Sequence, residues 1–111
     1  MNQSEVPNNE ILVRVQPTPN PNALKFVVSR TVKSSGKATF ARPSEATGVR
    51  LASDLFEIDG VRQLHLFENV ITVTYADDTD VDTLRFEVTA LIQRDLPVHD
   101  PDFLLEEEKK K

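Results

Sequence analysis

The chain contains two pairs of short segments in which apolar and polar residues alternate, and a stretch with helical spacing follows each pair. Residues 11–16 and 23–29 form the first pair, and residues 61–68 and 70–76 form the second. Such alternation is typical of strands with one buried face. Short connections favour hairpins, and Asn69 suits the second turn because asparagine tolerates a positive φ. Strands grouped before a helix, rather than alternating with helices one by one, indicate an α+β fold with a largely antiparallel sheet.

A first helix is expected between the two hairpins. Leu51, Ala52, Leu55 and Phe56 recur at helical spacing and predict its buried stripe. Ser44 is a predicted N-cap, although Gly48 weakens the first turn and favours a start nearer Val49. Gly60 is expected to end this unit as a left-handed cap or a tight turn.

A second, longer helix begins after Asp80 and is stopped by Pro97. Ahead of the first helix, residues 33–37 are predicted to be a polar turn and residues 38–41 a short third strand. The sequence therefore predicts a small two-layer α+β domain with a mostly antiparallel sheet and two helices, in the order β-β-(β)-α-β-β-α.

Composition limits the class of protein further. The chain has 111 residues, no cysteine and a formal net charge of −5. This length supports one domain, predicted at residues 10–97, with a disordered N-terminus at 1–9 and a loop and charged tail at 98–111. The absence of cysteine excludes disulfides, thiolate nucleophiles and cysteine-ligated clusters within these residues. No apolar run approaches the roughly 18 residues of a membrane span, so a cytoplasmic protein is expected.

No group of side chains in the sequence indicates catalysis or a metal site. His65 is expected on an exposed sheet face and His99 in a loop, and neither has a second histidine at ligand spacing. The acidic run at residues 77–82 is predicted to be a turn and helix cap, because it lacks the glycine and closing glutamate of a calcium loop. Neither an activated nucleophile nor a glycine-rich phosphate loop is present. A non-enzymatic protein without its own metal is expected.

Nucleic-acid binding is also disfavoured by the charge. Arg14, Lys25 and Arg62 are candidates for a basic sheet face, but they are few in an acidic chain.

The most unusual local feature is the proline-rich connection of the first hairpin. Prolines at positions 17, 19 and 21 fix their own φ and push the preceding residues toward extended geometry. Asparagine side chains there can bond nearby backbone groups, which predicts a rigid turn. A stiff surface loop also loses little entropy on binding, so the turn is a candidate partner-binding site. Its candidate residues are Thr18, Pro19, Asn20, Pro21, Asn22 and Lys25.

Three segments carry a resemblance to a known family. Residues 18–26 (TPNPNALKF), 51–61 (LASDLFEIDGV) and 69–74 (NVITVT) are similar to the N-terminal domain of Nfu-type (NifU-like) iron–sulfur cluster scaffold proteins. The resemblance extends over about residues 15–96 and implies a small α+β fold with three strands, a helix, two strands and a helix.

The chain departs from that family where the chemistry resides. Full-length Nfu proteins carry the cluster on a separate C-terminal domain with a Cys-x-x-Cys pair, and this chain contains no cysteine. The tryptophan usual near the start of the last helix is also absent. The resemblance therefore implies a stand-alone accessory module that contacts cluster-assembly or client proteins, and not a scaffold.

Two functional hypotheses follow. In the first, the chain is an interaction module in iron–sulfur cluster assembly or delivery. It binds no cofactor alone, and a Cys-x-x-Cys protein is a candidate partner. In the second, it is a small-ligand-binding or regulatory α+β domain unrelated to iron, an expectation based on fold analogy alone. A monomer without membrane or nucleic-acid partners is expected in either case.

Overall fold

The computed structural model describes residues 10–105. Residues 1–9 and 106–111, which are the predicted disordered N-terminus and the last six residues of the predicted tail, lie outside the described part. The elements are, in chain order, β1 (Val13–Pro17), β2 (Ala23–Val28), β3 (Lys33–Phe40), the 3₁₀ helix η2 (Pro43–Ala46), α1 (Arg50–Phe56), β4 (Val61–Glu68), β5 (Val70–Tyr75), α2 (Val81–Asp95) and the 3₁₀ helix η3 (Leu96–Val98).

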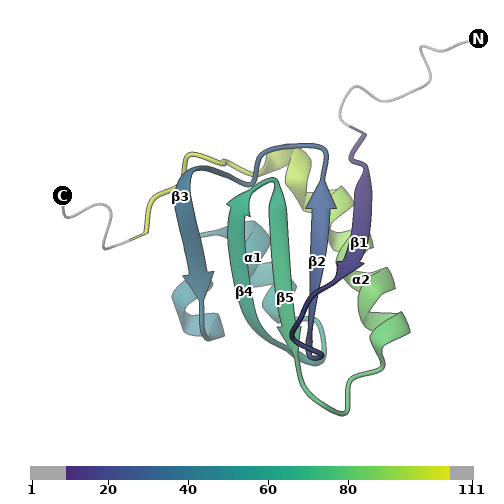
Figure 1. The fold of residues 1–111 in the computed structure, drawn as a ribbon. Helices are drawn as coiled ribbons and strands as arrows, with labels where there is room; N and C mark the ends of the chain where they lie inside the picture. The colour runs from purple at the N-terminus through teal and green to yellow at the C-terminus, as the bar shows by residue number, and fades with distance from the viewer. Residues whose placement is uncertain (1–9, 106–111) are drawn as a thin grey trace, which may run out of the picture.

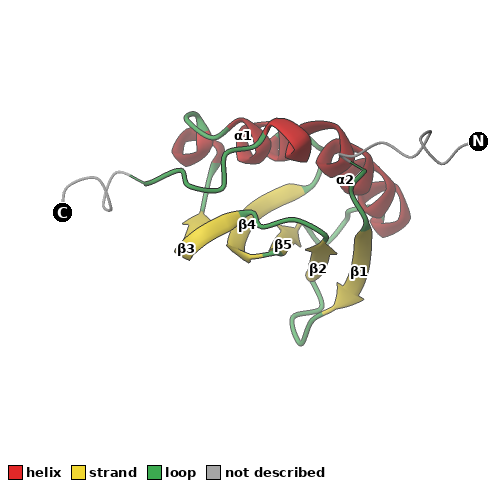
Figure 2. Cartoon of the chain, turned by 90° about the horizontal axis from the view of Figure 1, so that it is seen from above, coloured by secondary structure: helices red, strands yellow, loops and turns green. Residues whose placement is uncertain are grey.

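The strands form one sheet in the order β1-β2-β5-β4-β3, and every neighbouring pair is antiparallel. Figure 1 shows the sheet in front with α1 and α2 behind it. In Figure 2 both helices lie on the same side of the strands, and the other side of the sheet carries none. The predicted two-layer α+β fold is confirmed, and so are both hairpins and the third strand.

The core lies between the sheet and the helices. Alternation places Phe26, Ile71 and Leu66 side by side on adjacent strands, and each is fully buried. Leu55 of α1 and Val88 of α2 belong to the same apolar cluster. Since alternate residues point to opposite sides of a strand, the residues between these core positions face away from the helices.

Strand β3 differs from its prediction. Residues 33–37 were expected to be a turn, but they form the first half of an eight-residue strand. Its pairing with β4 is irregular between Lys33 and Lys37, where Gly36 has a φ of 68°. A glycine in the left-handed region lets an edge strand bulge and continue, so a polar stretch that resembles a turn remains in the sheet.

One local prediction about a helix cap is wrong. Ser44 caps no α-helix, because it lies inside η2; α1 starts at Arg50 after an extended Val49, close to the alternative start predicted from Gly48. In the second hairpin Asn69 lies in the turn, as predicted, and the positive φ of 54° belongs to its neighbour Glu68. Asn69 instead donates its side-chain amide to the Val28 carbonyl at 3.1 Å, which ties the hairpin to β2.

Residues 99–105, here called the C-terminal strap, cross the end of β3. His99 Nε2 donates to the Val32 carbonyl at 2.8 Å, and Lys33 Nζ donates to the Phe103 carbonyl at 2.8 Å. The Phe103 ring packs on Phe40, with a centroid distance of 6.3 Å, and lies 4.7 Å from Lys33 Nζ. These contacts leave Lys33 only 1% exposed, so the strap closes this edge of the core.

Candidate functional site

The proline-rich connection is a turn closed by its own side chains. Thr18 Oγ1 accepts from the Asn20 amide at 3.0 Å, and Asn20 Oδ1 accepts from the Asn22 amide at 2.8 Å. The Asn22 side-chain amide then donates to the Tyr75 carbonyl at 3.2 Å and to Asp77 Oδ1 at 2.7 Å. The predicted closure by asparagine side chains is confirmed, and it fastens the turn to the end of β5.

The predicted partner-binding residues divide into two groups. Thr18, Asn20 and Asn22 are brought together by these bonds. The Thr18 and Asn20 side chains bond within the turn, and the Asn22 side chain bonds to the Tyr75 carbonyl and to Asp77. Pro19 and Pro21 are exposed at its tip. Lys25 lies in β2, opposite Gln16, and belongs to the sheet surface rather than to the turn. Partner binding by these six residues stays a prediction.

The turn's bonds predict a loss of stability for one substitution. Replacing Asn22 with alanine removes the donor to the Tyr75 carbonyl and to Asp77, so the free energy of unfolding should fall by about 1–2 kcal/mol. Lys25→Ala is the matched control and should change it by less than about 0.5 kcal/mol. Urea denaturation followed by circular dichroism measures both. Equal midpoints for the two variants would contradict the structural role given to Asn22.

The sheet surface on which the described residues place no helix, here called the open face, includes two rows of side chains that each cross all five strands. Strand register aligns one row as Gln16, Lys25, Thr72, His65 and Thr39. The second row is Arg14, Val27, Val70, Phe67 and Lys37.

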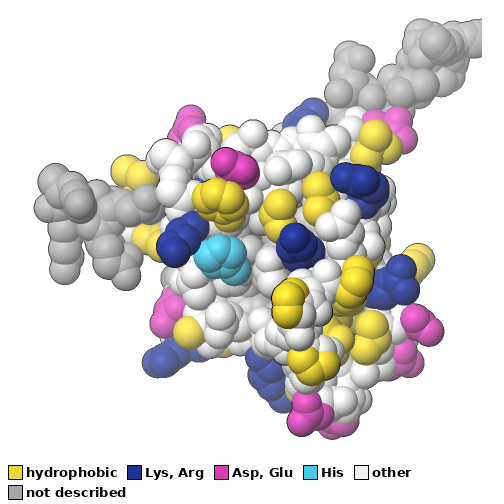
Figure 3. Space-filling model, viewed as in Figure 1, with side chains coloured by type: hydrophobic (Ala, Val, Ile, Leu, Met, Phe, Trp, Pro, Cys, Tyr) yellow, Lys and Arg dark blue, Asp and Glu magenta, His cyan; other side chains and the backbone are white. Residues whose placement is uncertain are grey.

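Charge is unevenly distributed between the two sides of the molecule. Neither row of the open face contains an acidic residue, although the whole chain has a net charge of −5. Figure 3 shows Lys, Arg and His side chains over the sheet, with most acidic groups toward the rim of this view. On the helix side, Arg94 pairs with Asp95 at 2.8 Å and with Asp54 at 3.1 Å. Within residues 10–105, no carboxylate lies within 4.0 Å of the charged groups of Arg14, Lys25 or Lys37.

His65 lies near the middle of the open face. Its Nδ1 is 2.7 Å from Thr39 Oγ1, which is a hydrogen bond between neighbouring strands. Burial, together with the nearby Lys37 ammonium, lowers the pKa of the imidazole below its usual range. The ring is therefore uncharged at neutral pH, and the positive charge of the face comes from arginine and lysine.

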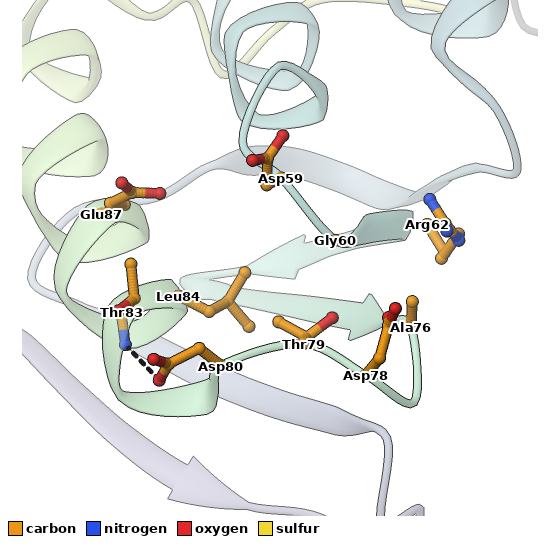
Figure 4. Close-up of a pocket in the computed structure, with 10 residues that line it drawn as sticks. All are labelled: Asp59, Gly60, Arg62, Ala76, Asp78, Thr79, Asp80, Thr83, Leu84 and Glu87. Atoms are coloured by element: carbon orange, nitrogen blue, oxygen red, sulfur yellow. Dashed lines mark hydrogen bonds between the residues drawn. The ribbon is translucent and has the colours of Figure 1, made fainter.

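A hollow of about 530 Å³ lies at the opposite end of β4 from the second hairpin. Figure 4 shows its lining residues, which are Asp59, Gly60, Arg62, Ala76, Asp78, Thr79, Asp80, Thr83, Leu84 and Glu87. The predicted cap is present, since Asp80 Oδ1 accepts from the Thr83 amide at 3.2 Å. The acidic run at residues 77–82 thus forms a turn and a helix cap, as predicted.

Gly60 and Thr79 approach each other closely at this hollow. Gly60 has a φ of 94°, and a Cβ placed on it would lie 2.5 Å from Thr79 Oγ1. Of the two roles predicted for Gly60, the tight turn is confirmed and the helix cap is wrong, because α1 already ends at Phe56 with Glu57 as its C-cap. The absence of a side chain there is what allows the loop after β5 to pack against the start of β4.

The described residues do not fit a resident metal or cluster. From residue 10 to residue 105, no group of three or more His, Asp or Glu side chains is placed to hold a metal ion. The sequence also has no cysteine to supply the thiolates of an iron–sulfur cluster. Neither helix in this part of the chain combines the length and apolarity needed to cross a bilayer.

The full set of residues on the open face could not be predicted from the sequence. Alternation already indicated that Arg14, Lys25 and His65 point away from the core. However, Phe67 and Lys37 join them only because β5 and β4 separate β2 from β3. Strand order, which no local pattern encodes, was the missing information.

Comparison with known proteins gives a family match over most of the chain. The profile of the family described as "Scaffold protein Nfu/NifU N terminal" matches residues 13–98. NifU-like protein 4, mitochondrial, from Arabidopsis thaliana is 34% identical over 82 residues, which cover 74% of this chain and 29% of that protein. The human NFU1 iron–sulfur cluster scaffold homolog, mitochondrial, is 33% identical over 87 residues, which cover 78% of this chain and 34% of that protein. The chain thus spans about a third of the length of these relatives.

A solved structure shares the fold. The solution structure of a NifU-like protein from Saccharomyces cerevisiae superposes with a TM-score of 0.76 and 21% identity, covering 97% of this chain and 96% of that one. At this identity the likeness concerns the fold alone. Both sequence relatives are named as mitochondrial, and the cytoplasmic location expected for this chain stays a prediction.

Proposed function

This chain belongs to the Nfu/NifU N-terminal family, and from that premise we propose that it is an accessory protein-interaction module in iron–sulfur cluster assembly or delivery. Its partners in this proposal are assembly or client proteins, including a Cys-x-x-Cys protein that supplies the cluster ligands. The chain itself is neither an enzyme nor a scaffold.

The observation that carries the proposal is family membership combined with a complete lack of thiols. The human relative is named an iron–sulfur cluster scaffold homolog, which links the family to cluster biogenesis. Cluster iron is held by cysteine thiolates, and none exists in these 111 residues. A role in this chemistry therefore has to pass through contact with another molecule. The rigid turn and the open face are surfaces available for that contact.

Affinity capture with identification by mass spectrometry tests the interaction. The tagged chain should retain cluster-assembly or iron–sulfur client proteins. Lys25→Ala and Pro19→Ala serve as comparison baits. Each removes the side chain of a candidate binding residue and keeps the hydrogen bonds that close the turn. Capture that contains no protein of either class would refute the proposal.

Anaerobic reconstitution with iron and sulfide tests the statement that this chain is not a cluster scaffold. The purified chain alone should show no charge-transfer absorbance, because it has no thiolate to bind iron. Adding a Cys-x-x-Cys domain should restore the chromophore on that domain. A stable cluster on the isolated chain would show that it acts as a scaffold after all.

A further inference from the structure

We propose that the open face is the docking surface of this domain, and that it binds a protein segment in which apolar side chains are flanked on both sides by carboxylates. The partner's place in iron–sulfur biogenesis rests on the proposed function. The surface and the chemistry of its occupant are argued from the described residues.

The second row of the open face has an apolar centre. Val27 pairs with Val70, and Val70 pairs with Phe67, so these three side chains are contiguous across β2, β5 and β4. Phe67 is 44% exposed, although it has a neighbour on both sides in the row, and large aromatic residues are more often buried. Exposed aromatic side chains on a rigid sheet are typical anchors of protein interfaces.

Cations lie at both ends of this apolar centre. Arg14 is next to Val27 on β1, and Lys37 is next to Phe67 on β3. Lys25 adds a third positive charge in the neighbouring row, two residues from Val27 along β2. None of the three has a carboxylate partner within residues 10–105, whereas Arg94 on the helix side has two. An occupant that brings its own carboxylates is therefore electrostatically complementary to the face.

The spacing of the cations sets the size of the occupant. Five strands at about 4.8 Å separation place Arg14 and Lys37 roughly 19 Å apart along the row. About six extended residues, or about thirteen helical residues, span that distance. A short acidic segment is thus long enough to reach both ends.

Two other occupants fit less well. A second copy seated symmetrically, open face on open face, would bring like charges together without a carboxylate between them. RNA-binding sheets stack bases on several aromatic side chains, and the two rows contain a single phenylalanine on a chain of net charge −5. A protein segment is consistent with both the apolar centre and the cations that have no carboxylate partner in the described part of the chain.

The probe is a displayed library of random peptides of about twelve residues, selected on the immobilised chain. Selected peptides should be enriched in apolar residues with Asp or Glu on both sides, and binding should weaken as salt rises. Selection of peptides without acidic enrichment, or failure to select any binder, would overturn the inference.

Charge reversal localises the binding. The triple variant Arg14→Glu, Lys25→Glu, Lys37→Glu should weaken the selected peptides roughly tenfold or more. Arg30→Glu, Arg42→Glu, Arg85→Glu makes the same net change at positions outside the sheet strands and should leave affinity within about twofold. If the reversed triple does not fold by circular dichroism, the corresponding triple Gln variant replaces it. Phe67→Ser tests the apolar centre separately and should also weaken binding.

The outcomes separate this inference from the proposed function. Equal loss with both triple variants, tight binding of single-stranded RNA, or a dimer by sedimentation that Phe67→Ser dissociates would overturn the docking surface. If captured iron–sulfur proteins stay bound to the charge-reversed triple variant of the open face, the docking surface is overturned and the proposed function is not. Peptide binding lost only in the reversed triple, without any captured iron–sulfur protein, would support the surface and refute the function.

Discussion

Alanine at position 60 is expected to lower the free energy of unfolding by about 3 kcal/mol or more. Gly60 has a φ of 94°, a conformation that costs a residue with a side chain about 1–3 kcal/mol. The added Cβ would also lie 2.5 Å from Thr79 Oγ1 and 2.9 Å from Thr79 Cγ2, well inside van der Waals contact. Overpacking of this kind costs about another 1–3 kcal/mol. Urea or thermal unfolding monitored by circular dichroism measures the sum.

Gly48→Ala is the matched control for this substitution. Apart from its two chain neighbours, no residue among 10–105 has a heavy atom within 4 Å of a Cβ placed on Gly48, and the φ of Gly48 is not in the left-handed region. Alanine there should leave stability unchanged or raise it by up to about 1 kcal/mol, because it restricts the unfolded chain.

A second substitution separates the clash from the backbone strain. Thr79→Ala removes the two atoms nearest to the new methyl group, so it should restore part of the stability lost in Gly60→Ala. It should cost little by itself, since Thr79 Oγ1 is buried without a hydrogen-bond partner among the described residues. A Gly60→Ala chain as stable as the Gly48→Ala chain would mean that the close approach of these two loops is absent in solution.

The sequence predicts most of this fold because two strong signals are local. Alternation defines β2 and β5 residue by residue, and apolar spacing defines α2 up to Pro97. Strand β3 is longer than its sequence pattern predicts, and the reason is physical. Lys33 looks like a turn residue, yet it is buried because its ammonium donates to Phe103, 70 positions later in the chain. No local pattern reports such a contact.

In the candidate site too, the sequence predicts local features but not the contacts between distant residues. Proline spacing predicts a stiff turn, and Asn22 closes it as expected. Its partners Tyr75 and Asp77 lie 53 and 55 positions away, so the anchoring to β5 could not be anticipated. The open face is likewise a property of strand order: its cations are ordinary surface residues in each strand and form a row only in the assembled sheet.

The Phe103 ring in the C-terminal strap is expected to contribute strongly to stability. Phe103→Ala should lower the free energy of unfolding by about 2–3 kcal/mol. The substitution removes the ring that packs on Phe40 at 6.3 Å, on His99 at 5.6 Å and beneath the Lys33 ammonium at 4.7 Å. It leaves the Phe103 carbonyl that accepts from Lys33, so the loss reports ring packing and the cation–π contact rather than the hydrogen bond.

Two further substitutions, at positions 104 and 103, separate the causes of this loss of stability. Leu104→Ala changes the next side chain, which is 46% exposed, and should alter stability by less than about 0.5 kcal/mol. Phe103→Leu keeps apolar volume but has no π face, so its stability should fall between those of wild type and Phe103→Ala. Thermal unfolding of the three variants ranks them. Because Lys33 is 1% exposed beneath the strap, Phe103→Ala should also make the Lys33 amine more reactive toward acylating reagents. If Phe103→Ala and Leu104→Ala unfold at the same midpoint and Lys33 stays protected, something other than the Phe103 ring covers this edge of the core.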